Sequence, residues 1–292
     1  MLKFKRERIL MNLFYVPALV LFLVFVIYPL FQGIYLSFTN WNGYSQNFKF
    51  VGVSNYIRFF TDKKVWTSML NTIIYGFGST ALQNILGLAL AILLNQKFAG
   101  RSLCRTIIYL PVMIAPLIMG YIMYFFVSFD RGALNDLLLL FGASKIDWMA
   151  DGSRAVFIIT IINALQFVGV SMVIYLAGLQ NIPSMYYEAA AIDGVNKWAQ
   201  FRYITLPLLM PAISSAVVIN LIGGLKLFDI IMALTGGGPG YASNSLSTLV
   251  HRTYFGSENA GYASAIGLIT FVFIILVSNV FVKMFEKRQV NL

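Results

Sequence analysis

Residues 184–212, SMYYEAAAIDGVNKWAQFRYITLPLLMPA, place charged and small side chains between two strongly apolar parts of the chain. The pattern predicts a short helix, because Ser184 can cap its amino end and the helix dipole stabilises the negative charge of Glu188 in its early turns. Gly194 is typical of a helix end. The alanines at 189–191 would let this helix fit into a cleft of another protein, although an amphipathic connector would show similar features.

The sequence contains no arrangement of residues that predicts catalysis. The patterns H-E-x-x-H, G-x-S-x-G and G-x-x-x-x-G-K-[ST] are absent, and no apolar segment holds paired carboxylates. The single cysteine, Cys104, cannot form a disulfide within the chain, and the single histidine, His251, has no second metal ligand nearby. We therefore expect a protein that is not an enzyme and that binds no metal, ATP or other cofactor by itself.

Polar side chains also occur within the apolar parts of the chain. Asn163, Gln166 and Phe167 are spaced i, i+3, i+4, while Asn220 and Gly223–Gly224 interrupt a later apolar stretch. Polar groups inside a membrane are costly and usually face a bundle interior or a cavity. There, amides can bind hydroxyl groups and an aromatic ring can pack on an apolar face of a ligand. Alternatively, Asn163 could form a hydrogen bond between helices, and the glycines could permit close helix packing.

The composition indicates which elements hold these residues. The chain is 59% hydrophobic and 11% charged, whereas soluble proteins are about half apolar and a quarter charged. Six windows without Asp, Glu, Lys or Arg approach or exceed the roughly 20 residues that cross a bilayer. We predict an all-α polytopic membrane protein with one transmembrane domain over residues 1–292. The predicted spans are approximately residues 11–36, 70–95, 106–128, 155–180, 206–234 and 262–283.

Basic residues predict the orientation of these spans. The positive-inside rule places both termini in the cytoplasm, because bases concentrate near the termini and in alternate loops. These bases are Lys3, Lys5, Arg6, Arg8, Lys97, Arg101, Arg105, Lys197, Arg202, Lys283, Lys287 and Arg288. The net charge of +10 is then a signal of orientation, and no basic soluble domain is present that would bind nucleic acid.

Two features follow the fifth predicted span. Lys226 and Asp229 are spaced i, i+3 near its outer end, where they could form an ion pair or line an outer gate. The sequence GGGPG at residues 236–240 must leave helical geometry.

The stretches EAAAIDG and ITLPLLMPA resemble the signature E-A-A-x(3)-G-x(9)-I-x-L-P of binding-protein-dependent ABC import permeases. The positions that match are Glu188, Ala189, Ala190, Gly194, Ile204, Leu206 and Pro207. Two further stretches, VGVSNYIRFFTDKKVWTSMLNT and LKLFDIIMALTGGGPGYASNSLSTLVHRTYF, resemble the carbohydrate branch related to the maltose permease, and in particular its first permease subunit. The resemblance covers nearly the whole chain and implies the type I ABC importer permease fold.

The resemblance also implies partners. A second, homologous permease would complete the pore, and an ABC ATPase homodimer would bind the ATP and magnesium. An extracytoplasmic sugar-binding protein would deliver a carbohydrate across the lipid of a bacterial cytoplasmic membrane. Residues 184–203 would form the cytoplasmic coupling helix region. Glu188, Ala189, Ala190 and Gly194 would contact the ATPase.

Alignment to the maltose permease implies positions that bind substrate. Aligning span five on GGGP implies Asn220, Gly223, Gly224 and Leu227, and aligning span four on the IP before the signature implies Gln166, Phe167 and Val170. Asn163 joins this set by its spacing. Several side chains differ from those of the maltose permease at these positions, so the sugar itself is not implied.

The sequence also bears on three other functions. An importer of a non-sugar solute such as glycerol phosphate would carry the same signature. An ion-driven secondary transporter would be expected to show an internal repeat and intramembrane acids, of which only Asp229 qualifies. A membrane enzyme would need a nucleophile, a metal or an acid pair, and the sequence offers none of these.

Overall fold

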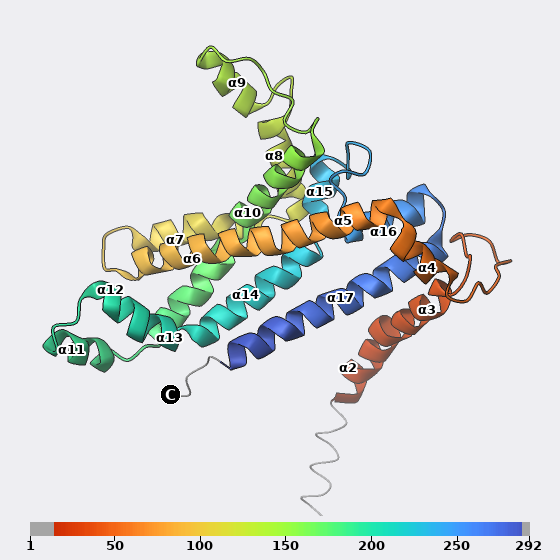
Figure 1. Ribbon diagram of the computed structural model, residues 1–292. Coiled ribbons are helices and arrows are strands. Elements are labelled where there is room, and N and C mark those ends of the chain that lie inside the picture. Colours follow the sequence, from red (N-terminus) through yellow and green to blue (C-terminus); the bar gives the residue numbers. More distant parts are fainter. Residues whose placement is uncertain (1–14, 288–292) are drawn as a thin grey trace, which may run out of the picture. The chain divides into compact units, whose positions relative to one another are not determined.

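The computed structural model describes residues 15–287 (Figure 1). Within this range the chain forms helices and one isolated antiparallel bridge between Thr39 and Phe50, and it contains no β-strand. The predicted all-α class is confirmed. Residues 11–14 of the first predicted span lie outside the described residues, as do Lys3, Lys5, Arg6, Arg8 and Arg288.

The chain divides into two compact units, of which the smaller contains residues up to 62 and residues 250–269. Its helices are α2 (Tyr15–Phe22), η1 (Leu23–Ile27), α3 (Tyr28–Ser37), α4 (Ser54–Thr61), η5 (Arg252–Gly256), the end of α16 (Leu246–His251) and the start of α17 (Ala260–Glu286). The α2 helix buries no residue, as expected of an apolar helix that faces lipid. The guanidinium of Arg58 lies 4.0 Å from the centre of the Tyr262 ring, and the Tyr262 hydroxyl donates to Asp62 Oδ2 at 3.1 Å.

The larger unit contains residues 63–249 and the chain from residue 270 onward. It begins with α5 (Lys63–Ile73), η2 (Ile74–Gly78), α6 (Ser79–Asn95), α7 (Arg101–Tyr109), η3 (Leu110–Met113), α8 (Pro116–Val127), α9 (Ala133–Leu140) and α10 (Gly152–Gln180). It continues with α11 (Met185–Ile192), α12 (Lys197–Gln200), η4 (Phe201–Thr205), α13 (Leu206–Leu208), α14 (Met210–Leu225), α15 (Asp229–Leu234), most of α16 and the rest of α17.

The α10 helix is the central element of the larger unit and packs against both α6 and α14 (Figure 1). Its amino end is capped by the Asp151 carboxylate, which accepts a hydrogen bond from the Arg154 amide at 2.8 Å. Two glycines permit backbone contact on its flanks. A Cβ on Gly87 of α6 would overlap the Ser171 side chain of α10, and a Cβ on Gly169 would lie 2.9 Å from the carbonyl oxygen of Ile108.

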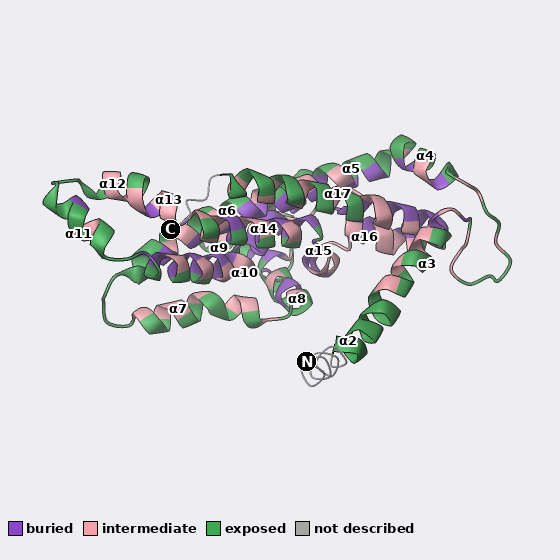
Figure 2. Ribbon diagram, turned by 90° about the horizontal axis from the view of Figure 1, so that it is seen from below, coloured by how far each residue is buried: buried purple, intermediate pink, exposed green. Residues whose placement is uncertain are grey.

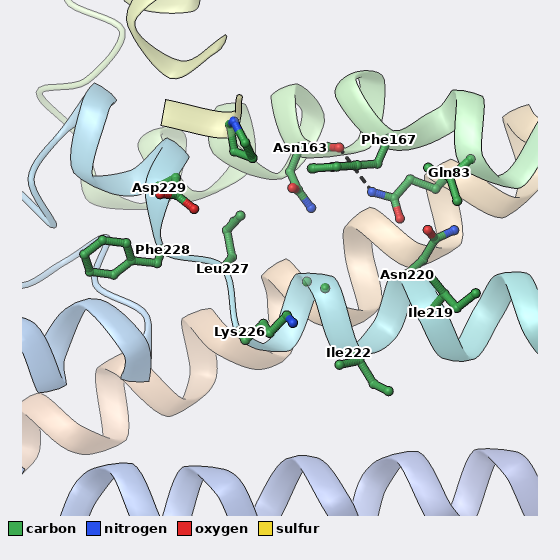
Figure 3. A pocket seen from close by; sticks show the side chains of 14 residues that line it. Gln83, Asn163, Phe167, Ile219, Asn220, Ile222, Lys226, Leu227, Phe228 and Asp229 are labelled. Atoms are coloured by element: carbon green, nitrogen blue, oxygen red, sulfur yellow. Dashed lines mark hydrogen bonds between the residues drawn. The ribbon is translucent and has the colours of Figure 1, made fainter. Parts of the chain in front are cut away.

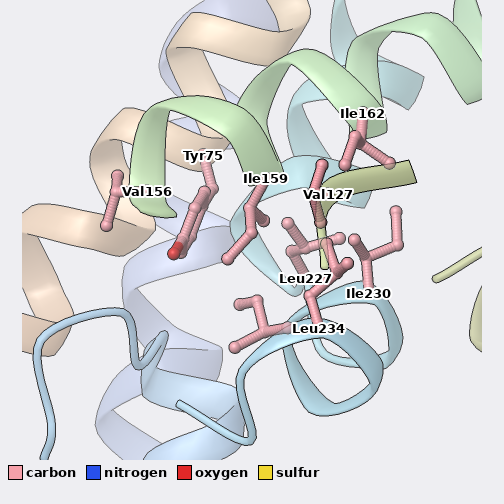
Figure 4. Packing of buried hydrophobic residues seen from close by; sticks show 9 residues of the cluster. Tyr75, Val127, Val156, Ile159, Ile162, Leu227, Ile230 and Leu234 are labelled. Carbon is pink, nitrogen blue, oxygen red and sulfur yellow. The ribbon is translucent and has the colours of Figure 1, made fainter. Parts of the chain in front are cut away.

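Two buried apolar clusters lie at different levels of α10. The first cluster comprises Tyr75, Val127, Val156, Ile159, Ile162, Leu227, Ile230, Ile231 and Leu234 (Figure 4). The second comprises Ala91, Leu94, Met172, Tyr175, Leu176, Leu179, Ile182, Leu209 and Ala216. Residues 163–171 of α10 therefore lie between two cores. In Figure 2 much of α10 is buried, whereas α11 and α12 are mostly exposed.

Four helical stretches of the described chain are long and apolar enough to cross a membrane: Tyr15–Ser37, Lys63–Asn95, Gly152–Gln180 and Ala260–Glu286. Two bent pairs would raise the number to six. Arg101–Met113 and Pro116–Val127 meet at 101°, and Lys197–Leu208 and Met210–Leu225 meet at 67°. The third and fifth predicted spans are therefore not straight helices. Proline explains both bends, because Pro116 starts α8 and Pro211 follows the second break.

The segment after α15 leaves helical geometry as predicted, with positive φ at Gly236, Gly237 and Gly240. It is held against α5. The Asn71 amide donates to the carbonyl oxygens of Ala242 and Asn244 at 2.7 and 3.0 Å. The segment in turn holds the chain at Leu227, whose carbonyl oxygen accepts a bond from Ser245 Oγ at 2.7 Å.

Candidate functional site

The polar insert after α10 folds as two short helices, α11 and α12. Asn196 caps α12, since its side chain accepts a hydrogen bond from the Ala199 amide at 2.8 Å. Ser184 occupies the cap position of α11, but its side chain makes no capping hydrogen bond. The predicted helix is present, and the predicted role of the Ser184 hydroxyl is wrong. The helix starts with the backbone instead, where the Glu188 amide donates to the Ser184 carbonyl oxygen at 3.0 Å.

Gly194 ends α11 with φ of +71°, a left-handed conformation that favours glycine. The Val195 amide donates to the Ala190 carbonyl oxygen at 2.9 Å, and the Gly194 amide donates to the Ala191 carbonyl oxygen at 3.1 Å. These two bonds are the Schellman arrangement that closes a helix end. No atom lies within 4 Å of a Cβ placed on Gly194, so the backbone conformation, and not space within the chain, favours glycine here.

Most of this insert is exposed. Of the four residues predicted to contact an ATPase, Glu188, Ala189 and Gly194 are exposed, while Ala190 faces the protein and is buried. Large apolar side chains are exposed beside them, with Ile192 at 87%, Trp198 at 69% and Tyr203 at 74%. An exposed apolar surface on an insert that also carries charges is typical of a protein interface.

The insert is attached to the bundle through Tyr187. Its ring packs on the second buried cluster, and its hydroxyl forms a hydrogen bond of 2.9 Å with Thr205 Oγ1. A force on α11 can therefore reach the bundle through this contact as well as through the chain.

A cavity of about 650 Å³ lies within the larger unit (Figure 3), a size typical of ligand sites. Its walls come from α6, α8, α10, α14, the linker at residues 226–228 and α15. The lining residues are Gln83, Pro116, Asn163, Phe167, Val170, Ile219, Asn220, Ile222, Gly223, Gly224, Lys226, Leu227, Phe228 and Asp229. Seven of the eight residues predicted to bind substrate thus lie around one space.

The cavity combines amides with an aromatic ring (Figure 3). Asn163 and Phe167 come from α10 and Asn220 from α14. The Asn220 amide nitrogen donates to Ser171 Oγ behind the wall. Such a lining can bind hydroxyl groups through the amides and an apolar ring face through Phe167.

Gln166 is the predicted residue that the structure does not bring to the cavity lining. Its amide nitrogen donates to the carbonyl oxygen of Ile114 at 3.1 Å, at the bend between η3 and α8. Gln83 lines the cavity instead, and sequence reasoning missed it. The available signal was the pair Gln83–Asn84 inside an otherwise apolar helix, because buried amides in a span usually face a partner or a cavity.

Lys226 and Asp229 both line the cavity, and Figure 3 shows them apart, with Leu227 between them in this view. No ion pair within 4.0 Å joins these two residues in the part of the chain that the structure describes. Since one is cationic and one anionic, the charged groups of the lining sum to zero.

The two cavity glycines differ in their surroundings. A Cβ on Gly224 would lie 2.9 Å from Gly76 Cα, Ser79 Oγ and the carbonyl oxygen of Tyr75, so α14 meets η2 and α6 through its backbone. A Cβ on Gly223 would meet no atom within 4 Å. Gly224 therefore serves close packing, whereas Gly223 leaves open space at the cavity wall.

Within residues 15–287 no group of three or more His, Cys, Asp or Glu side chains is arranged to hold a metal ion. The arrangement offers binding by amides, an aromatic ring and two separated charges. A helical membrane protein with a polar cavity between two cores, and with an exposed insert at one end of its central helix, has the architecture of a transport component.

The chain belongs to the family of binding-protein-dependent transport system inner membrane components, whose model matches residues 83–291. Trehalose/maltose transport system permease protein MalF of Thermococcus litoralis is 35% identical over 97% of this chain and 96% of that protein. Multiple sugar-binding transport system permease protein MsmF of Streptococcus mutans is 36% identical over 95% of each chain.

The fold is that of ABC importer permeases. A chain of a bacterial ABC transporter that imports the acidic polysaccharide alginate matches with a TM-score of 0.84, at 23% identity over 98% of this chain and 97% of that one. A second structure, the alginate transporter in complex with a periplasmic protein bound to an alginate pentasaccharide, gives a TM-score of 0.82 at 22% identity, over 96% of this chain and 95% of that one.

Proposed function

We propose that this chain is the permease subunit of an ATP-driven importer for a carbohydrate, either a disaccharide or a longer oligosaccharide. The observation that carries the proposal is the cavity, in which Asn163 and Asn220 accompany the ring of Phe167. Amides and an aromatic face are the groups expected to bind a sugar. The names of the relatives MalF and MsmF, which refer to trehalose, maltose and multiple sugars, support the same substrate class.

The substrate would occupy the space lined by Asn163, Phe167, Val170, Asn220, Gly223, Gly224 and Leu227. Gln166 would act behind this lining, where it bonds to the backbone at Ile114. The cavity walls come from several helices, so a change in the angle between those helices would change the shape of the site. Such a change is what alternating access requires.

The importer would need partners that this chain does not provide. A second, homologous permease would complete the pathway, and an extracytoplasmic binding protein would deliver the sugar. The structurally similar alginate transporter was crystallised with its periplasmic protein. The assembly would lie in a bacterial cytoplasmic membrane, with both termini and the α11–α12 insert on the cytoplasmic side.

An ABC ATPase dimer would bind the ATP and magnesium and would drive transport through α11. The exposed positions of Glu188, Ala189 and Gly194 support this role. Ala190, which is buried, would instead pack α11 against the helix bundle. This chain would itself be non-catalytic, and its contribution would be to bind the sugar and to transmit motion.

The neutral sum of charges in the lining favours a sugar over glycerol phosphate, the alternative substrate. Lys226 could bind a phosphate, but Asp229 lines the same cavity and would repel it. A single phosphate would therefore be attracted by Lys226 and repelled by Asp229, whereas a neutral sugar carries no net charge for either residue to attract or repel.

The experiment is uptake by a strain from which this gene is deleted, with and without the gene restored. The labelled probes are trehalose, maltose, a malto-oligosaccharide and glycerol 3-phosphate. We expect restored uptake of at least one sugar and no difference for glycerol 3-phosphate. Restored uptake of glycerol 3-phosphate alone would overturn the carbohydrate assignment.

The coupling role has a separate test in the assembled importer. A cysteine placed at Glu188 and a second one on the ATPase subunit should form a cross-link. Absence of this cross-link, while the same cysteine at position 188 cross-links to one placed on the second permease, would contradict the proposed contact.

A further inference from the structure

Gln83 lies on α6 and lines the cavity, yet only 1% of its surface is exposed. Its amide nitrogen donates to the backbone carbonyl oxygen of Asn163 at 3.1 Å, the bond drawn in Figure 3. A carbonyl oxygen can only accept a hydrogen bond, so the NH2 end of the Gln83 amide must face it. The orientation of the side chain is therefore determined, and Oε1 is directed away from Asn163.

Gln83 Oε1 is buried and has no hydrogen-bond partner among the described residues. Other buried side-chain atoms of the described chain share this property, among them Ser68 Oγ, Thr80 Oγ1, Arg105 Nε, Gln166 Oε1, Asn244 Nδ2 and Ser278 Oγ. Gln83 is the one residue of that set that lines the cavity. A buried acceptor without a partner is costly. Oε1 has almost no exposed surface here, and because Gln83 borders the cavity, a donor in the cavity would satisfy it after a small shift of the side chain.

Asn220 presents a similar group from the opposite helix. One N–H of its amide nitrogen donates to Ser171 Oγ, and its carbonyl oxygen can accept a hydrogen bond. Figure 3 shows the amides of Gln83 and Asn220 in the same region of the cavity. Both amide oxygens can accept a hydrogen bond from a ligand in this region, while each amide nitrogen already uses one of its two N–H groups within the protein.

We propose that Gln83 is a specificity-determining residue whose Oε1 accepts a hydrogen bond from a hydroxyl group of the transported carbohydrate. This proposal rests on the proposed carbohydrate function of the chain. It adds Gln83 as a residue that contacts the substrate, and it makes the substrate the hydrogen-bond donor in that contact. At this position the substrate must donate a proton in a hydrogen bond. A neutral hydroxyl meets that requirement, while a carboxylate or phosphate oxygen does not.

A substrate that lacks this hydroxyl would leave Gln83 Oε1 unsatisfied in the loaded site. Sites built to bond a substrate hydroxyl discriminate against analogues without it, because a buried polar group is then unpaired. Gln83 should therefore contribute to the choice between a sugar and its deoxy derivative, which a purely structural role would not affect.

The test uses Gln83→Met, which keeps the length of the side chain and removes its acceptor. The matched control is Thr80→Val, one turn earlier on α6, which also removes a buried oxygen without a partner but lies outside the cavity lining. Uptake rates are measured in the restored strain with labelled trehalose and maltose and with their monodeoxy derivatives. Abundance of each variant in the membrane is measured in parallel.

We expect Gln83→Met to reduce uptake of the parent sugar about three- to tenfold, the range of one neutral hydrogen bond. For one monodeoxy derivative, wild type and variant should transport equally, so the discrimination seen in wild type disappears. Thr80→Val should transport like wild type. If Gln83→Met is lost from the membrane, Gln83→Asn, a shorter amide that moves the oxygen, should show the same loss of discrimination.

Two outcomes would overturn the assignment. Discrimination among all deoxy derivatives that is unchanged in Gln83→Met would show that Oε1 does not bind the substrate. Unchanged discrimination in Gln83→Met together with lost discrimination in Gln166→Met would assign the contact with the substrate hydroxyl to Gln166 instead. Failure of the wild-type gene to restore uptake of any sugar would instead refute the carbohydrate function, and this inference with it.

Discussion

The α11–α12 insert and the cavity are the two candidate functional regions of the larger unit, and they are built in opposite ways. The insert is one contiguous, exposed segment, closed by local bonds at Gly194 and Asn196. The cavity is buried and takes its lining from α6, α8, α10, α14 and α15. The insert presents its side chains at the surface, whereas the cavity forms only when several helices pack correctly against one another.

This difference determines how each region tolerates change. A substitution on the exposed face of the insert should leave the bundle intact and would affect the proposed contact with a partner. A substitution at the cavity wall can alter either binding or packing, depending on whether the side chain faces the space or the neighbouring helix. The adjacent residues Gly223 and Gly224 show both situations: Gly223 faces open space, and Gly224 packs against neighbouring backbone.

The largest expected effect is that of Glu188→Lys on the insert. Reversal of this exposed charge should lower sugar uptake at least about 30-fold, as expected for a broken charge contact across an interface. The amount of the chain in the membrane should be unchanged, because exposed substitutions alter stability by at most about 0.5 kcal/mol. Uptake and an immunoblot of membranes measure both quantities.

Asp193→Lys is the matched control for Glu188, since it makes the same change of charge at the end of the same helix. It should reduce uptake much less. Equal losses in both variants would mean that the overall charge of the insert matters, and not the position of Glu188.

The second effect concerns packing at the cavity wall. Gly224→Ala should lower the free energy of unfolding by about 1–3 kcal/mol, because its methyl group would overlap backbone atoms of η2. Gly223→Ala should leave the free energy within about 1 kcal/mol of wild type, since its methyl group meets open space. Thermal unfolding of the purified complex in detergent distinguishes them, and equal stability of both variants would refute the close approach.

The third effect tests the binding side of the cavity. Asn220→Ala removes an amide from the lining and leaves Ser171 Oγ without its donor, and it should reduce uptake about tenfold. Affinity of the binding protein for the sugar should not change. The control Ser215→Ala lies on the same helix at an exposed position and should transport normally. A normal rate for Asn220→Ala would remove Asn220 from the site.

The smallest effect concerns how the insert is attached. Tyr187→Phe removes the hydrogen bond to Thr205 Oγ1, which is worth about 1 kcal/mol. Amide hydrogen exchange in α11 should become about fivefold faster, while exchange in α10 stays the same. Tyr186→Phe, at an exposed neighbour, is the control. Identical exchange in all three proteins would show that the chain connection alone holds α11.

The sequence predicted the insert better than the cavity, and the reason is physical. The end of α11 at Gly194 depends on residues within one turn, so the local pattern is sufficient. The cavity positions on α10, on α14 and at Leu227 were reached by spacing and by resemblance, and seven of the eight share one space. Their roles in binding and the role of Glu188 in coupling remain predictions.

The position of Gln83 could not be predicted in this way. Which face of α6 meets α10 depends on the contact between Gly87 and Ser171, two residues on different helices. The break at residues 226–228 has a similar explanation, since Ser245 Oγ donates to the Leu227 carbonyl oxygen from a distant segment. Hydropathy shows that a segment is apolar, but the direction of a bend depends on what packs against it.

The close seating of α10 has a mechanical consequence. At Gly87 of α6 and at Gly169 of α10 the helices approach so closely that even a methyl group would not fit, which restricts sliding of α10 at these two points. Its 29 residues extend for about 43 Å at 1.5 Å per residue, from the capped end at Asp151 to the short link that precedes α11. A displacement of the insert would thus be transmitted to the far end of α10, with the helix acting as a rigid element. The freedom to reshape the pathway would be confined to the joints at Ala115, Leu209 and Leu227.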